Sequence, residues 1–137
     1  MDTTPSTPVR AEAFVKTGLR YLLALGMMAI GVLHFVNPEP FVQIVPASLP
    51  VPLALVYVSG FFEFLGGAGL LVPRVRRAAA WGLVALYIAV FPANVNMAIH
   101  HIALSPDHPI PTSLLWARLP LQAVLVAWAW WYTRPPR

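Results

Sequence analysis

The sequence predicts an all-α protein, a bundle of four transmembrane helices with both termini in the cytoplasm. Three observations lead to this prediction. Apolar residues make up 58% of the 137-residue chain and charged residues only 10%, whereas soluble domains carry roughly 25% charged residues. Four apolar stretches reach the roughly 20 residues that a helix needs to cross the hydrocarbon core. Lys and Arg lie on alternate sides of these stretches, as in multi-pass membrane proteins.

The four predicted spans follow one another with little chain between them. The segment before the first span is mostly polar and contains prolines, which is not the pattern of a cleaved signal peptide. We therefore expect residues 1–17 to be a short, disordered cytoplasmic tail, residues 18–133 a single membrane domain, and residues 134–137 a second cytoplasmic tail. The predicted helices cover residues 18–36, 52–73, 78–99 and 113–133.

The connections between the spans indicate the orientation. A tight turn between the second and third helices carries Arg74, Arg76 and Arg77, whereas the loops at about 37–51 and 100–112 contain no Lys or Arg. The positive side is expected to be cytoplasmic. The two outer loops are rich in proline, which fixes φ and removes a backbone donor, so extended covers are expected there. The net charge of +4 favours anionic lipid over nucleic acid, because the basic groups are divided among three short flanks.

Two charged residues, Glu63 and Arg118, lie inside the predicted spans. A bare charge at mid-bilayer costs from about 3 to more than roughly 10 kcal/mol, so such residues usually face the bundle interior and mark a site. A rise of about 1.5 Å per residue places both in the outer half, with backbones about 8 Å apart in depth. We expect the two to compensate one another, directly, through Gln122 or through water. Alternatively Glu63 is protonated, because burial disfavours the charged carboxylate.

Other polar residues lie at the same level. His34 is near the outer end of the first helix, Asn94 is in the outer third of the third helix, and Gln122 is one turn below Arg118. The interior prolines Pro92 and Pro120 each free a backbone carbonyl, which is tolerated at membrane depth where a cavity or neighbour satisfies it. These residues are either a buried set that fixes helix register or a ligand-binding or proton-handling site, for which the candidates are His34, Glu63, Asn94, Arg118 and Gln122.

Several kinds of chemistry have no support in the sequence. The chain has no cysteine, so it cannot act as a CxxC oxidoreductase, and it has no nucleotide-binding fingerprint. Its histidines, His34, His100, His101 and His108, fit no standard zinc spacing, so no metal site is predicted. No cofactor is evident, although a quinone remains possible, and any redox centre would come from a partner protein.

Long parts of the chain resemble one family of small bacterial membrane proteins, the DoxX family. The resemblance runs from about residue 20 onward through GVLHFVNPEPFVQIVPASLPVP, VSGFFEFLGGAGLLVP, FPANVNMAIH and RLPLQAVLVAW. Its most specific parts are the G-x-x-E step, the PAN step and the R-x-P-x-Q step, at Gly60–Glu63, Pro92–Asn94 and Arg118–Gln122. The resemblance implies a four-helix bundle in the inner membrane and an association with quinone-linked sulfur oxidation and oxidative-stress systems. Where relatives use cysteine, this chain has none.

Two functions follow as expectations. In the first, a quinone-like lipophilic molecule binds in the outer half of the bundle, where Arg118, Gln122 and His34 bond its oxygens and Glu63 exchanges protons, as part of a membrane redox system. In the second, the protein is a non-catalytic assembly or anchoring factor whose buried polar residues are structural. Whether it is an enzyme stays open, and a homo-oligomer is compatible with either function.

Overall fold

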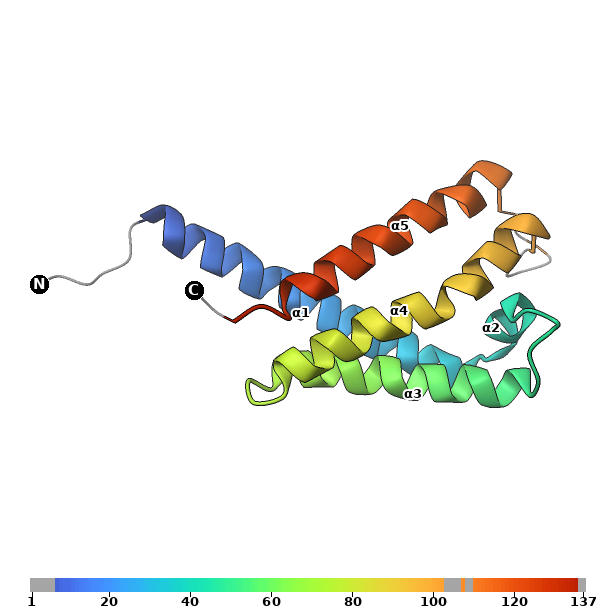
Figure 1. Cartoon of the computed structure of the whole chain (residues 1–137), viewed down its shortest axis with the longest axis horizontal. Helices are drawn as coiled ribbons and strands as arrows, with labels where there is room; N and C mark the ends of the chain where they lie inside the picture. Colours follow the sequence, from blue (N-terminus) through green and yellow to red (C-terminus); the bar gives the residue numbers. More distant parts are fainter. Residues whose placement is uncertain (1–6, 103–106, 108–109, 136–137) are drawn as a thin grey trace, which may run out of the picture.

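The computed structural model contains five helices in the part of the chain that it describes, residues 7–102, 107 and 110–135. Within these residues, all helices except the second are long and apolar enough to cross a membrane. This confirms the predicted all-α class and the four predicted spans. The helices are α1 (Thr7–Val36), α2 (Glu39–Ile44), α3 (Pro52–Leu71), α4 (Arg76–Ile99) and α5 (Thr112–Trp131) (Figure 1).

The first helix is longer than predicted. It begins at Thr7, so residues 7–17 continue the helix and the expectation of a disordered segment there is wrong. Pro8 lies in the first turn, where its missing N–H costs nothing, and Ala11 and Ala13 are strong helix formers. This part of α1 projects past the end of α5 in Figure 1. Residues 1–6 and 136–137, which belong to the two predicted tails, lie outside the described residues.

The loop between α1 and α3 is also partly helical, which corrects the expectation of an extended cover. Its short helix, α2, spans Glu39–Ile44, with Pro38 at the N-cap and a proline in the first turn. Proline is compatible with these positions because the first N–H groups of a helix have no partner within the helix. The carboxylate of Glu39 in the first turn is favourable at the positive end of the helix dipole.

The helices form a bundle with two unlike ends. Antiparallel packing joins α1 to α3, α3 to α4, and α4 to α5. We call the end where α2 lies the α2 end, and the end with the α3–α4 turn and the start of α1 the terminal end (Figure 1). At the terminal end, the guanidinium of Arg76 donates from Nε to the carbonyl of Leu70, 2.9 Å away. This bond holds the tight turn that the sequence predicts between α3 and α4.

Small residues bring α1 and α3 into backbone contact. A Cβ added at Gly67 would lie 2.6 Å from the carbonyl oxygen of Ala24, and one at Gly31 would lie 2.7 Å from that of Gly60. Ala24 and Gly31 are seven residues apart on α1, and Gly60 and Gly67 are seven residues apart on α3. One face of each helix therefore makes both contacts. Close approach through small residues is a usual packing mode of membrane helices. These contacts place α1 directly against α3 beside Glu63.

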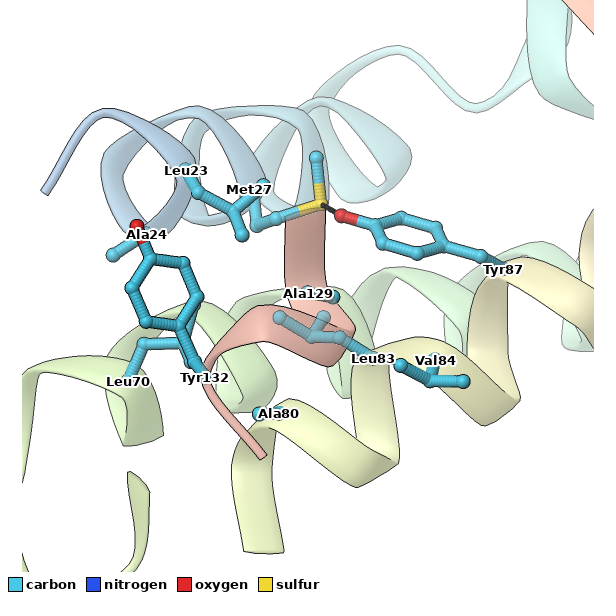
Figure 2. Packing of buried hydrophobic residues seen from close by; sticks show 10 residues of the cluster. All are labelled: Leu23, Ala24, Met27, Leu70, Ala80, Leu83, Val84, Tyr87, Ala129 and Tyr132. Atoms are coloured by element: carbon cyan, nitrogen blue, oxygen red, sulfur yellow. Dashed lines mark hydrogen bonds between the residues drawn. The ribbon is translucent and has the colours of Figure 1, made fainter. Parts of the chain in front are cut away.

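The main hydrophobic cluster lies toward the terminal end, where all four long helices meet (Figure 2). Within it the Tyr87 hydroxyl donates to the sulfur of Met27, 2.7 Å away, which joins α4 to α1. The Tyr132 hydroxyl donates to the carbonyl of Lys16 at 2.9 Å, so the end of α5 is fixed to α1. The cluster comprises Leu23, Ala24, Met27, Leu70, Ala80, Leu83, Val84, Tyr87, Ala129 and Tyr132.

Candidate functional site

A cavity of about 510 Å³ occupies the bundle toward the α2 end. It lies between the main hydrophobic cluster and a smaller one, in which Ile44 of α2 packs with Met97, Ala98 and Leu115. All four long helices, α2 and the loop after it contribute to the lining, which is mainly apolar. The five residues that the sequence singles out all line this cavity: His34, Glu63, Asn94, Arg118 and Gln122.

The contact between α1 and α3 positions two of these side chains, His34 and Glu63. Gly60 lies one turn from Glu63 on α3 and directly against the Cβ of His34 on α1. Because no side chain separates the helices there, His34 and Glu63 are held beside one another, 6% and 8% exposed respectively. Phe41 of α2 stacks on the His34 ring, with centroids 3.8 Å apart, and so covers it from the α2 end.

His34 contacts Glu63 without forming a full hydrogen bond. Its Nδ1 lies 3.3 Å from Oε2 of Glu63, but the same nitrogen is only 2.8 Å from the carbonyl oxygen of Ile30. A carbonyl can only accept, so Nδ1 carries its hydrogen and directs it to Ile30. Within the described residues, Oε2 of Glu63 is buried without a hydrogen-bond partner. The site therefore contains a deeply buried carboxyl group whose hydrogen-bonding capacity is unfilled.

Glu63 and Arg118 do not form the pair that the sequence suggested. Both line the cavity, but the only ion-pair contact of Glu63 among the described residues is with His34. Gln122 does not bridge them either, since its amide group bonds to other partners. In the described part of the chain, no hydrogen bond, ion pair or ring contact involves the half-buried Arg118. Among the described residues, the cavity thus holds a cation without a partner and a carboxyl group whose only charged neighbour is His34.

Asn94 and Gln122, by contrast, satisfy one another. Nδ2 of Asn94 donates to Oε1 of Gln122 at 3.1 Å, and Nε2 of Gln122 donates to the backbone carbonyl of Tyr87 at 2.8 Å. Tyr87 lies five residues before Pro92 in α4, whereas the carbonyl that the missing N–H of Pro92 leaves free is that of Ile88, four residues before the proline. The two bonds of Gln122 link α4 to α5.

Replacing Gln122 with leucine is expected to lower the free energy of unfolding by about 1–2 kcal/mol, because two interhelical bonds are lost at roughly 0.6 kcal/mol or more each. Unfolding in mixed micelles of a mild detergent and SDS measures the change. The same substitution at Gln43, whose side chain is exposed on α2, is the matched control and should have no effect. Equal stability of the two variants would show that the amide pair does not hold α4 to α5.

Two residues of the site were missed from the sequence. Tyr87 lines the cavity and supplies the carbonyl that Gln122 binds; it lies seven residues before Asn94, on the same helical face, and this spacing was a usable signal. Phe41 stacks on His34, and no periodicity in its proline-rich segment indicates that contact. Among the described residues, no three His, Asp or Glu side chains gather in a way that suits a metal, and His108 lies outside them.

Comparison with known proteins gives one family. Residues 23–133 match the model of a domain of unknown function, DUF8561. No curated protein and no solved structure matches the chain. The matched region includes all five cavity residues that the sequence singles out, and every helix except the first part of α1. The chain belongs to the DUF8561 family.

Proposed function

We propose that the cavity binds a quinone-like lipophilic molecule and that the protein is a DoxX-type component of a membrane redox system. In this proposal the chain spans the bacterial inner membrane with both termini in the cytoplasm. The positive charges at the terminal end support that orientation. The α2 end and its cavity then face the outer leaflet.

The observation that carries the proposal is that Arg118 and Glu63, both among the described residues, line the cavity without forming an ion pair with each other. An apolar chamber of about 510 Å³ is of the size usual for small-molecule sites, which combine apolar walls with a few placed polar groups. Glu63 and Arg118 both line it, and no ion pair within the described ranges joins them. Charged groups inside a membrane bundle usually mark ligand or proton pathways. A structural role alone would favour pairing them.

In this proposal the polar residues have different tasks. The guanidinium of Arg118 has only donors and would bond a carbonyl or phenolate oxygen of the ligand. Glu63 would give or take a proton at the ligand, and Nε2 of His34 would accept or donate beside it. Gln122 and Asn94 hold each other, so they shape the wall rather than supply the main ligand bonds. Electrons would have to come from or pass to a partner protein, since the protein groups on the wall are not redox centres.

The proposal is tested by titrating the purified protein in mild detergent with a short-tailed benzoquinone and following tryptophan fluorescence. Trp116 lies two residues from Arg118 on α5 and is the nearest reporter in the sequence. Saturable quenching is expected for the wild type. In Arg118→Gln the dissociation constant should rise about tenfold or more, the effect of losing roughly 1.4 kcal/mol or more of charged hydrogen bonding.

The control for this titration is Arg74→Gln, which makes the same charge change at the exposed turn of the terminal end. It should bind the quinone like the wild type. Quenching that is linear in concentration, or equal in all three proteins, would show that the quinone only partitions into the micelle and would rule out the proposed site.

A second function, assembly or anchoring, is favoured by a different observation. The Asn94–Gln122–Tyr87 bonds join α4 to α5, and the glycine contacts join α1 to α3. These are packing interactions that need no ligand. If the titration finds no site, this role becomes the better explanation of the bundle.

A further inference from the structure

A second hollow, a groove, adjoins the cavity on the surface of the bundle. This groove runs along the junction of α3 and α4, has a volume of about 780 Å³, and is lined by thirteen residues that are all apolar or glycine. Three of them, Phe62, Leu86 and Ala89, also line the cavity. The groove and the cavity are therefore adjacent, and these three residues lie between them.

The groove owes its shape to small residues on α4. Ala78, Gly82, Ala85 and Ala89 follow one another at spacings of four, three and four residues, so they share one face of the helix. All four line the groove, and a Cβ built at Gly82 would have no heavy atom within 4 Å among the described residues. From Phe62 to Val72 on α3 the groove extends about 15 Å along the helix axis.

The cavity has polar groups on its wall and the groove is entirely apolar, so together they match a ligand with a polar head and an apolar tail. The cavity presents the polar groups of Arg118 and Glu63, and Glu63 is 8% exposed with Oε2 unbonded in the described structure. The groove presents no polar side chain. Phe62 and Ala89 form a shared wall between the two hollows, and both residues are exposed.

We infer that the ligand carries a long hydrocarbon tail, which leaves the cavity between Phe62 and Ala89 and lies in the α3–α4 groove. The ligand would enter sideways from the bilayer between these helices, with its polar head in the cavity and its tail directed toward the terminal end. This inference rests on the proposed function, because it describes the tail of the molecule whose head the cavity binds. It narrows the class of ligand to a molecule with a prenyl-type or similar single-chain tail.

The test is photoaffinity labelling of the full chain in lipid nanodiscs. The probe is a benzoquinone with an isoprenoid-length tail that ends in a diazirine, and the labelled peptides are identified by mass spectrometry. We expect labelling at the far part of the groove, around Val72, Val75 and Ala78, and we expect excess short-tailed quinone to displace it. Gly82→Trp fills the groove where space is open, and should reduce this labelling about tenfold, equivalent to roughly 1.4 kcal/mol, without weakening the short-tailed quinone.

Gly18→Trp is the matched control, because Gly18 also has open space in the described structure and lies on α1 outside the groove. It should label like the wild type. Labelling that short-tailed quinone displaces but that maps outside the groove would overturn the tail path and leave the head site standing. Loss of all displaceable labelling, together with no saturable binding of the short-tailed quinone, would instead overturn the proposed function.

Two other occupants give distinct results. If ordinary lipid fills the groove, a phospholipid with the same diazirine will label it equally and the quinone will not displace it. If a second copy of the chain covers the groove, the probe will not label it, and Gly82→Trp will change the oligomeric state. Either result would overturn the inference.

Discussion

Replacing Gly60 with alanine is expected to lower the free energy of unfolding by about 1–3 kcal/mol, the usual cost of overpacking a well-packed contact. The added methyl group would meet the Cβ of His34 and would lie 3.0 Å from the carbonyl oxygen of Gly31. Neither atom is the end of a flexible side chain, so α1 and α3 must move apart. Reversible unfolding in mixed micelles measures the change.

Gly82→Ala is the matched control for this prediction. Its added Cβ meets nothing within 4 Å in the described structure, so only the better helix propensity of alanine acts, worth up to about 1 kcal/mol. We expect Gly82→Ala to be neutral or stabilising while Gly60→Ala destabilises. Similar changes in the two variants would contradict the backbone contact between α1 and α3 beside Glu63.

Replacing Glu63 with methionine is expected to weaken quinone binding at least about tenfold and to leave the free energy of unfolding unchanged or higher, by up to about 4 kcal/mol. The carboxyl group is buried, and its Oε2 lacks a hydrogen-bond partner in the described residues. Removing a buried group of this kind relieves an uncompensated desolvation cost. The quinone binds more weakly because the variant no longer has the Glu63 carboxyl group that would contact it.

This variant separates a functional from a structural carboxyl group. Glu39→Met, at an exposed acidic residue of α2, is the control; it should leave binding unchanged and lower the free energy of unfolding by at most about 1 kcal/mol, the favourable dipole interaction that is lost. If Glu63→Met unfolds more easily than the wild type and still binds the quinone, then Glu63 holds the bundle together and the assembly role gains.

The long helices were largely predictable because their signals are local and repeated. The predicted spans 52–73, 78–99 and 113–133 correspond to helices that end within two residues of those bounds. The start of α1 was missed because residues 7–17 are polar, and the hydropathy that marks a span says nothing about a helix that continues beyond it. The short helix α2 was missed because proline was taken to exclude a helix, whereas Pro38 and Pro40 lie where a helix accepts it.

The site was predictable in depth but not in pairing. The rise per residue placed His34, Glu63, Asn94, Arg118 and Gln122 in the same half of the bundle, and all five line one cavity. The predicted contact between Glu63 and Arg118 was wrong because the depth of a residue along its helix does not give the distance between helices. Glu63 meets His34 rather than Arg118 since glycines bring α3 against α1. The cavity itself depends on how the helices separate toward the α2 end, which no local pattern records.

The central claim is that the cavity binds a quinone-like ligand through residues that the fold does not need. The most direct test is the thermal unfolding midpoint of the wild type and Arg118→Gln over increasing concentrations of short-tailed benzoquinone. A ligand that binds only the folded state stabilises it by about 2.7 kcal/mol at a concentration of 100 times the dissociation constant. We predict a midpoint that rises with ligand in the wild type, and a smaller rise in a variant that is equally stable without ligand. No rise in the wild type, or the same rise in both proteins, would contradict the claim.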